Sequence, residues 1–377
     1  MRVRAAVLRE MGHAGPFAHS KPLSVESLTL SPPGNGEIRV RVLAAGLCHS
    51  DLSVINGSRP RPMPMVMGHE ATGEVVELGG HVRDFAVGDR VVFSFVPMCG
   101  HCLPCASGRP VLCEPGAAAN AQGQLLESAS HWTDDSGQPL LHHLGVSGFA
   151  EYTVVSARSA VRIDADLPAE IAALFGCAVM TGVGAVINTA RVQSGESVAV
   201  FGLGGVGLSA LLGAHAASAW PLIAVDVVEE KLALARRLGA SHCINASHGD
   251  AVAEIRDITS GGVEHAIESV GSEAVLAQAY AATRRGGTTL TVGLPAPGRM
   301  FSVPAVSLVA EERTVKGSYM GSAVPSRDIP RYIDLYRAGR LPVDRLLTHR
   351  LKLDDINEGF DRLADGTAIR QIIEFDT

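Results

Sequence analysis

Residues 197–217 read SVAVFGLGGVGLSALLGAHAA, and this stretch decides the fold of the surrounding part of the chain. An apolar run typical of a buried strand leads into glycines with the spacing GxGxxG, and a run typical of a helix follows. In such a unit the glycines allow a tight turn, close approach of a pyrophosphate, and close packing of helix on strand. The free N–H groups at the start of the helix favour a phosphate. We therefore predict a dinucleotide-binding turn formed by Gly202, Gly204, Gly205, Val206 and Gly207.

The residue that follows the next strand indicates which dinucleotide binds. The apolar run PLIAVD ends in Asp226, 19 residues after Gly207. A carboxylate at this point can accept hydrogen bonds from an adenosine ribose, and its charge repels a 2′-phosphate. The position therefore favours NAD over NADP. A glycine-rich turn in a domain without a nucleotide is the simpler alternative, because the chain has 41 glycines.

The patterns on either side of this motif indicate two kinds of domain. From residue 197 to residue 294, strand-like runs alternate with helical ones, which is typical of a parallel sheet covered by helices. Before residue 175, short β-branched runs separated by Gly and Pro indicate an irregular, mostly β domain. Residues 169–190 have a helical composition, and residues 115–148 read as a long polar loop. The predicted fold class is therefore α/β.

The composition limits the possible partners. The 377-residue chain has 46 % hydrophobic and 19 % charged residues, as expected for a globular protein of two or three domains. Its net charge of −7 disfavours nucleic acid and anionic membranes, and we expect neither as a partner. The first residues lack the apolar core of a signal peptide, and residues 205–227 read as a helix followed by a buried strand. We therefore expect a cytoplasmic location, where thiols stay reduced.

Four of the seven cysteines lie within residues 99–113, CGHCLPCASGRPVLC. The spacing C-x2-C-x2-C-x7-C lets successive thiolates turn toward one centre, and the fourth returns after a loop. Disulfides do not suit a reducing compartment. An iron–sulfur cluster uses the same ligands, but no neighbouring motif indicates electron transfer. Four thiolates around zinc make a closed, structural site, so we predict a structural zinc held by Cys99, Cys102, Cys105 and Cys113.

A second set of soft ligands is scattered along the chain. Cys48 in GLCHSDL, His69 in MGHEATG and Cys177 in FGCAVMTG are each bracketed by small residues, as expected near a tightly packed site. Taken alone, such a cysteine is usually a small hydrophobic residue, and a histidine beside a glutamate is usually a surface residue. Together they supply three protein ligands and leave a fourth position open, which is the pattern of a catalytic zinc. The remaining Cys243 reads as strand packing.

These motifs closely resemble, in this order, those of the zinc-dependent medium-chain alcohol dehydrogenases. The resemblance runs from GHExxG through the four-cysteine cluster, GCAVMTG and GLGGVG to the closing THRLKLDDINEGFDRLADGTAIRQIIEF, and it is closest to the long-chain branch with two zincs. It implies a GroES-like catalytic domain over residues 1–178 and 322–377, and a Rossmann domain over residues 179–321. NAD and substrate would then bind in the cleft between the two domains.

The resemblance also implies roles for single residues. Ser50 would relay the proton of the alcohol, and Asp51 would orient His69. Glu70 would lie just behind the metal. Phe95 and Leu144 would line the substrate pocket. The other residues that the resemblance places near NAD are His49, Thr181, Lys231, Val292 and Arg370.

The implied activity is hydride transfer between an alcohol and NAD, giving an aldehyde or ketone. The alcohol would be a primary one, including aromatic and allylic alcohols, or a secondary one. Each chain would carry one catalytic and one structural zinc. Zinc would act as a Lewis acid on the alcohol oxygen, and NAD would accept the hydride. The resemblance further implies a homodimer or homotetramer.

Two residues depart from the pattern of many family members. Ser53 replaces a histidine three residues after the relay hydroxyl, so we expect the relay to end in water or another base. The rate should then depend less strongly on pH. His49 stands where arginine is frequent, which predicts looser binding of NADH.

Two other functions stay open as alternatives. One is a formaldehyde dehydrogenase that depends on glutathione or mycothiol. The glutathione branch carries a basic residue where this chain has Ala117, and a mycothiol-linked enzyme is harder to separate on sequence. The other is an NAD-binding structural or regulatory protein without catalysis. Such a protein would be expected to lose metal ligands or the relay hydroxyl, and all of these are present here.

Overall fold

Three sheets carry the fold in the computed structural model, which describes residues 1–376. Contacts divide the chain into two units. The first comprises Met1–Cys177, Val324–Arg331 and Asp344–Thr377, and it contains a closed barrel and a seven-stranded sheet. The second comprises Ala178–Ala323 and Tyr332–Val343, and it contains a six-stranded sheet. The two-domain α/β class predicted from the sequence is therefore confirmed.

The barrel of the first unit encloses a small apolar core. Trp132 lies at its centre with Leu28, Leu30 and Leu140, and all four are at most 1 % exposed. In order around the barrel, its strands are β1 (Arg2–Leu8), β2 (Leu23–Leu30), β7 (Trp132–Thr133), β8 (Pro139–His142) and β4 (Met65–Val66).

The seven-stranded sheet provides the frame of the candidate metal site. Its central strand β3 pairs antiparallel with β5 on one side and with β9 and β18 on the other. In sheet order its strands are β10 (Ala160–Ile163), β6 (Arg90–Phe93), β5 (Glu70–Leu78), β3 (Glu37–Gly46), β18 (Arg370–Glu374) and β17 (Leu347–Leu351), with β9 (Tyr152–Ser156) beside β3.

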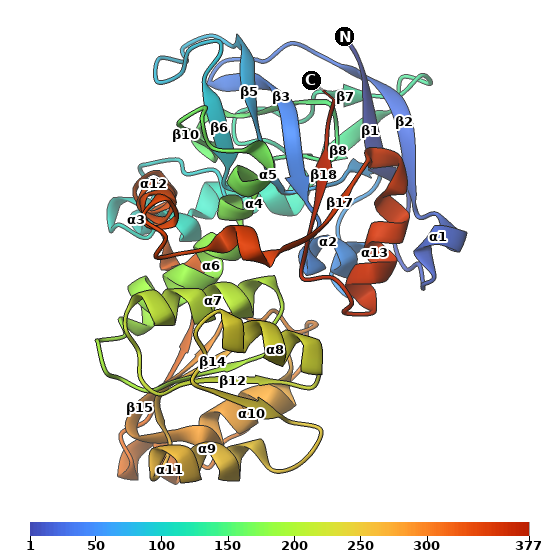
Figure 1. Ribbon diagram of the computed structural model, residues 1–377. Helices are drawn as coiled ribbons and strands as arrows, with labels where there is room; N and C mark the ends of the chain where they lie inside the picture. The colour runs from blue at the N-terminus through green and yellow to red at the C-terminus, as the bar shows by residue number, and fades with distance from the viewer. Residues whose placement is uncertain (377) are drawn as a thin grey trace. The chain divides into compact units, whose positions relative to one another are not determined.

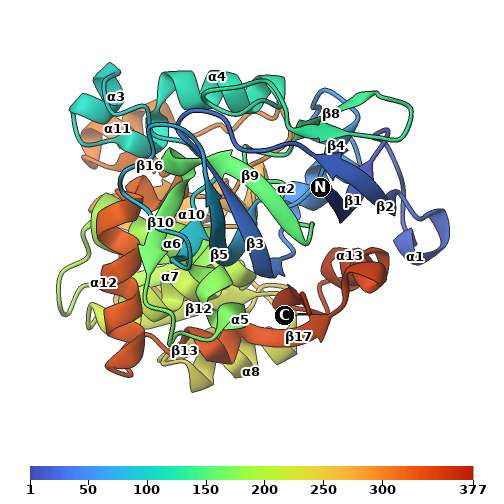
Figure 2. The same cartoon turned by 90° about the horizontal axis from the view of Figure 1, so that it is seen from above.

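Short helices complete the first unit. Figures 1 and 2 both show α13 (Ile356–Ala364) beside α1 (Phe17–Ser20). The Asp361 carboxylate of α13 accepts the N–H groups of Phe17 at 2.5 Å and of Ala18 at 2.8 Å, so it caps α1. The other helices of this unit are α2 (His49–Ile55), α3 (Leu103–Ala106), α4 (Glu114–Gln122) and α5 (Ala169–Ala172).

The second unit is a parallel sheet with helices on both faces. Figure 1 shows α7 and α8 on one face and α9 and α10 on the other. In sheet order its strands are β13 (His242–Asn245), β12 (Leu222–Asp226), β11 (Val198–Phe201), β14 (Val263–Glu268), β15 (Thr283–Thr291) and β16 (Thr314–Gly317). Its helices are α6 (Ala178–Gly184), α7 (Gly205–Ala216), α8 (Glu229–Arg237), α9 (Ala251–Thr259), α10 (Glu273–Ala282) and α11 (Ala305–Ala310).

Two expectations from the sequence need correction. Residues 332–343, expected in the catalytic domain, belong to the second unit because Tyr332 is buried there and accepts a hydrogen bond from Nδ2 of Asn188 at 3.3 Å. This segment includes the end of α12 (Pro325–Arg337). Residues 115–148, read as a loop, contain most of α4 and the β7–β8 hairpin, because Gly123 ends α4 in a left-handed turn (φ +67°) and leads the chain back to the barrel.

Among the described residues, no single helix is long and apolar enough to cross a membrane, although the bent pair Ala169–Gly176 and Ala178–Ala190 has the length and composition when counted together.

Candidate functional site

Cys48 and His69 come together because β3 and β5 are antiparallel neighbours. Gly46, the last residue of β3, pairs with Glu70, the first residue of β5. Cys48 lies two residues beyond the end of β3, and His69 immediately precedes β5. Both residues therefore lie at the same end of these two paired strands. Gly68 before His69 has φ +93°, a left-handed conformation that favours glycine.

Cys177 reaches the same place from a helical segment. The predicted helix over residues 169–190 is interrupted here: a 3₁₀ turn (Ala173–Gly176) ends at Cys177, whose φ of −138° and ψ of −76° are not helical. The turn lies close to β6, since a Cβ on Gly176 would contact the carbonyl oxygen of Phe93 at 2.5 Å. A glycine at position 176 therefore lets the chain carry Cys177 to the edge of the sheet.

The three side chains form one group of possible metal ligands. Their ligand atoms lie within 4.8 Å of one another, and Cys48, His69 and Cys177 are at most 8 % exposed. Sγ of Cys177 lies 3.5 Å from Nε2 of His69. Zinc bonds of about 2.3 Å to sulfur and about 2.0–2.1 Å to nitrogen would place two tetrahedral ligands about 3.6 Å apart. The donor atoms, two sulfurs and one nitrogen, and the distance from Sγ of Cys177 to Nε2 of His69 therefore fit zinc.

The environment favours ionisation of one of the two thiols. A hydrogen bond with Cys177 lowers the pKa of Cys48 well below its usual value, against the effect of burial, and His69 and Arg370 lower it further. The same hydrogen bond, together with burial, raises the pKa of Cys177. The environment of the pair therefore favours one thiolate, which is the form that binds metals.

Asp51 fixes the orientation of His69. Oδ1 of Asp51 lies 3.0 Å from Nδ1 of His69, and Oδ2 accepts the backbone N–H of Cys48 at 3.2 Å. Burial raises the pKa of Asp51, but the charge of His69 and hydrogen bonds from two histidines lower it below the usual range. An ionised carboxylate can only accept hydrogen bonds, so Nδ1 of His69 carries a proton and Nε2 faces Cys177.

Glu70 and Arg370 form a buried ion pair at the same edge of the sheet. Oε1 of Glu70 accepts a hydrogen bond from Nη2 of Arg370, and the two side chains are 0 % and 4 % exposed. Gly46 provides the space, because a Cβ at this position would overlap both side chains. Arg370 is thus turned onto Glu70 inside the first unit.

Of the other residues expected around the substrate, Phe95 lies beside His69, and His49 and Ser50 directly follow Cys48. The ring of Phe95 stands perpendicular to that of His69, with centroids 5.2 Å apart. Leu144 is 7 % exposed and has φ +50°. His49 and Ser50 open α2, where His49 is exposed and Ser50 is partly exposed.

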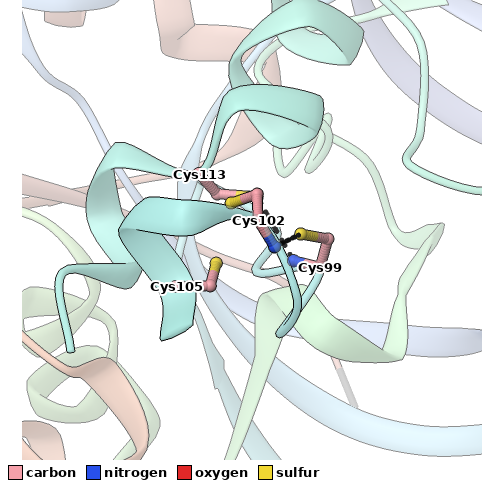
Figure 3. Close-up of side chains that lie close together, drawn as sticks. All are labelled: Cys99, Cys102, Cys105 and Cys113. Carbon is pink, nitrogen blue, oxygen red and sulfur yellow. Dashed lines mark hydrogen bonds between the residues drawn. The ribbon is translucent and has the colours of Figure 1, made fainter. Parts of the chain in front are cut away.

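The four clustered cysteines form a second group of possible metal ligands (Figure 3). Sγ of Cys102 and Sγ of Cys113 lie 3.9 Å apart, too far for a disulfide of about 2.05 Å. Thiolates on a tetrahedral zinc with bonds of about 2.3 Å would lie about 3.8 Å apart. Burial raises the pKa of the Cys99 thiol, but the backbone N–H groups of His101 and Cys102 overcome this and lower it to about 6. The cluster therefore fits a zinc site.

The predicted strand, turn and helix of the dinucleotide motif are present in the second unit. Gly202 follows β11 with φ +86°, and a Cβ on Gly207 would overlap the carbonyl oxygen of Gly202. A Cβ built on Gly204 would have no neighbouring atom within 4 Å, so a ligand can approach the backbone closely at this residue. β11 lies between β12 and β14, where the order of the strands reverses. Ligands of parallel sheets bind at the carboxyl ends of strands at such a reversal.

Asp226 is held in place by the backbone around it. Its Oδ2 accepts the N–H of Leu203 at 2.6 Å, and its Oδ1 accepts those of Val227 at 2.8 Å and Val228 at 3.0 Å. The carboxylate therefore joins the glycine turn to the end of β12. Val227, the next residue, is 61 % exposed and uncharged.

The remaining residues expected near NAD lie on three elements of the second unit. Thr181 is 9 % exposed on α6, Lys231 is partly exposed in the first turn of α8, and Val292 follows β15 directly. Glu268 at the end of β14 was not predicted; it accepts the N–H of Gly271 at 2.5 Å and the hydroxyl of Thr291 at 2.6 Å. The signal was a carboxylate at the end of a buried strand.

The fold and these sites define a class of protein. A GroES-like unit that carries thiolate and imidazole donors, in one chain with a dinucleotide-binding sheet, is typical of metal-dependent oxidoreductases. Residues 34–165 match the model of the alcohol dehydrogenase GroES-like domain, and residues 205–338 match that of zinc-binding dehydrogenases.

Known proteins support this assignment over the whole chain. The chain is 39 % identical to geraniol dehydrogenase of Castellaniella defragrans, over 99 % of this chain and 97 % of that protein. It is 36 % identical to S-(hydroxymethyl)glutathione dehydrogenase of a Synechocystis species, over the full length of both. The crystal structure of benzyl alcohol dehydrogenase from Acinetobacter calcoaceticus superposes with a TM-score of 0.91 at 34 % identity, covering both chains completely.

The chain therefore belongs to the zinc-dependent medium-chain alcohol dehydrogenases, and the protein is an oxidoreductase of that family. The alternative of an inactive NAD-binding protein is not favoured.

Proposed function

We propose that the protein oxidises an allylic or aromatic primary alcohol to its aldehyde with NAD, in a reversible reaction. The observation that carries this proposal is the convergence of Cys48, His69 and Cys177, whose ligand atoms lie within 4.8 Å of one another. Three protein donors, one fewer than tetrahedral zinc takes, are typical of a catalytic rather than a structural site.

In this proposal the three side chains hold a zinc ion, and the four clustered cysteines hold a second one. Zinc at the three-ligand site supplies Lewis-acid activation of the alcohol oxygen. Asp51 keeps Nε2 of His69 turned toward the thiols. Oγ of Ser50 would accept the proton of the substrate hydroxyl while it passes its own proton on to water or another base. The buried charge of Glu70, paired with Arg370, lies behind the ligands and tunes the field at the site.

The glycine turn and Asp226 support NAD as the hydride acceptor. The Asp226 carboxylate is fixed by three backbone N–H groups, so it meets a 2′-phosphate as a rigid negative charge. The uncharged Val227 beside it offers no partner for such a phosphate. In the proposal Thr181 and Val292 lie near the nicotinamide and Lys231 near the adenosine ribose. His49 and Arg370 are assigned to the pyrophosphate.

The substrate class rests on the relatives and on the pocket residues. Two of the relatives named above are a geraniol and a benzyl alcohol dehydrogenase. Phe95 supplies aromatic surface next to His69, and we assign the buried Leu144 to the apolar wall of the same pocket; such a lining suits an unsaturated alcohol. Ser50 is smaller than threonine and leaves more room beside the reacting carbon.

A thiol-dependent formaldehyde dehydrogenase is the second candidate, because one relative is an S-(hydroxymethyl)glutathione dehydrogenase. The residue of α4 that would bind the glutathione carboxylate is the exposed Ala117, which has no charge.

A panel of geraniol, benzyl alcohol, ethanol and 2-propanol, with NAD and with NADP, tests the first proposal. Formaldehyde with glutathione or with mycothiol tests the second. Turnover only with a formaldehyde–thiol adduct would reject the first proposal in favour of the second.

We further propose a homodimer or homotetramer in the cytoplasm, without nucleic acid or membrane as partner. The family resemblance supports the assembly, and clustered thiols suit a reducing compartment. Sedimentation of the purified protein tests the assembly.

A further inference from the structure

His143 lies beside the carboxylate that orients His69. Its side chain is 1 % exposed, and its Nδ1 lies 3.0 Å from Oδ1 of Asp51. The same oxygen lies 3.0 Å from Nδ1 of His69. The two imidazole rings stand at 90° to each other, with centroids 5.6 Å apart. One carboxylate oxygen therefore faces two buried histidines.

Strand pairing places His143 there. β8 runs parallel to β4, with His142 opposite Val66, and β4 leads through Met67 and Gly68 into His69. The N–H of His143 donates to the carbonyl of Val66 at 3.2 Å and lies 3.2 Å from Oγ of Ser147. The backbone of His143 is thus attached to the segment that delivers His69.

The contacts of Asp51 leave little freedom for its carboxylate. Oδ2 accepts the N–H of Cys48, and Oδ1 faces the two imidazole nitrogens. A carboxylate oxygen can accept two hydrogen bonds but cannot donate one. Among the described residues, Nδ1 of His143 has no well-aligned hydrogen-bond partner, and its 3.0 Å approach to Oδ1 of Asp51 is the ion-pair contact that the structure gives it. A proton on Nδ1 of each histidine is therefore the arrangement that satisfies Asp51.

We propose that His143 is a positioning residue: its Nδ1–H holds Asp51 in the rotamer that orients His69. His143 thereby controls how tightly Cys48, His69 and Cys177 hold zinc. This inference rests on the proposed function, because it needs a metal at these three residues. Partners of a metal-binding histidine orient the ring, and their loss typically weakens metal binding about 10- to 100-fold.

The neighbouring His142 provides a matched control. It is equally buried, but its ring faces the barrel core, with Nδ1 3.2 Å from Oγ of Ser147 and the ring of Trp132 at 6.2 Å. Replacement of His142 removes a buried imidazole without removing the contact to Asp51.

The experiment compares four full-length, zinc-loaded variants with the native protein. His143→Phe keeps a ring but removes the donor, and His143→Gln moves the amide toward the position of Nε2. His143→Asn places an N–H where Nδ1 stood, and His142→Gln is the control. Zinc content, the rate of zinc release to a chelator, and the absorption spectrum after cobalt substitution are measured, together with circular dichroism.

We expect His143→Phe and His143→Gln to release one zinc at least about 10-fold faster and to alter the cobalt spectrum. The zinc of the four-cysteine cluster should stay bound. His143→Asn and His142→Gln should behave like the native protein. If either His143→Phe or His143→Gln folds and keeps native zinc release and spectrum, the inference is wrong. It is equally wrong if His143→Asn releases zinc as fast as His143→Gln. If the native protein binds zinc only at the four-cysteine cluster, the proposed function fails instead.

Discussion

Nδ1 of His69 lies 3.0 Å from Oδ1 of Asp51, and both side chains are fully buried. Because the carboxylate can only accept, this contact sets which nitrogen of His69 carries the proton and which one faces Cys177. The chemistry of the site therefore depends on a residue that is not itself a ligand.

Replacement of Asp51 tests this dependence. In Asp51→Asn the charge is lost and the amide can turn its NH₂ group toward His69, so the ring is no longer held in one tautomer. We expect kcat/KM for benzyl alcohol to fall about 10- to 100-fold, with faster loss of zinc. Asp250→Asn is the control, because Asp250 accepts N–H groups at the start of α9 in the second unit. Unchanged kinetics in Asp51→Asn would contradict the assigned role.

The four-cysteine cluster should contribute to stability rather than to chemistry. We expect Cys113→Ser to lose one zinc and to lower the free energy of unfolding by several kcal/mol, on the order expected for a structural metal site. Cys243→Ser is the control, because the thiol of Cys243 lies outside both groups of possible metal ligands and donates to the carbonyl of Leu232 at 3.4 Å, a bond that a serine can also make. Urea unfolding and metal analysis provide the comparison. Equal stability of the two variants would exclude a structural metal at the cluster.

Asp226 should determine the choice of cofactor. Asp226→Asn keeps the oxygen that accepts the N–H groups of Val227 and Val228, gives up the bond from Leu203, and removes the charge that repels a 2′-phosphate. We expect the ratio of kcat/KM with NADP to that with NAD to rise about 10-fold, a change of about 1.4 kcal/mol in relative binding. Glu229→Gln, which alters an exposed carboxylate three residues away, should leave the ratio unchanged. A ratio that does not respond to Asp226→Asn would reject this role.

Features that are local in the chain could be predicted from the sequence. The GxGxxG turn needs only a strand before it and a helix after it, and the structure contains both. The cysteines of residues 99–113 lie within a few residues of one another, so their spacing already indicated a common centre. The two-domain α/β class followed from the change between β-rich and alternating patterns.

Features that depend on pairing of distant segments could not be predicted. The contact between His143 and Asp51 depends on β8 pairing with β4, and β4 has only two residues, too few for any pattern. The break at Cys177 is hidden in an apolar sequence that fits a continuous helix equally well. The assignment of residues 332–343 was wrong because the contacts of Tyr332 arise from packing against segments more than a hundred residues away.

The buried His142 predicts a loss of stability in acid. Burial and, to a smaller extent, the charge of His131 lower its pKa to about 3, against the opposing charge of Glu37. Below a pH of about 6.5 the unfolded chain therefore takes up a proton that the folded chain does not. The contribution of the neutral His142 side chain to the free energy of unfolding is complete above pH 6.5 and is lost as the pH falls toward 3.

When the pH is lowered from 7.5 to 5.5, we expect protonation of His142 in the unfolded chain to lower the free energy of unfolding by about 1.4 kcal/mol. In His142→Gln the pH dependence over this interval should be smaller by that amount, as measured by urea unfolding. His248→Gln is the control, since the side chain of His248 is 72 % exposed. The same pH dependence in native protein and His142→Gln would refute the prediction.

Ser53 offers a test of the proton relay proposed for Ser50. Oγ of Ser53 donates to the carbonyl of His49 at 2.8 Å, so its hydroxyl is bound to the backbone of α2. A serine does not titrate near neutral pH, whereas a histidine has a pKa of about 6.5. In Ser53→His we expect kcat to gain a titration near this pH and to fall several-fold below it, because a protonated imidazole cannot accept the proton passed on from Ser50. Ser53→Ala removes only the bond to His49 and should keep the native pH profile. If Ser53→His also keeps that profile, the proton passed on by Ser50 does not leave by way of residue 53, and this route is rejected.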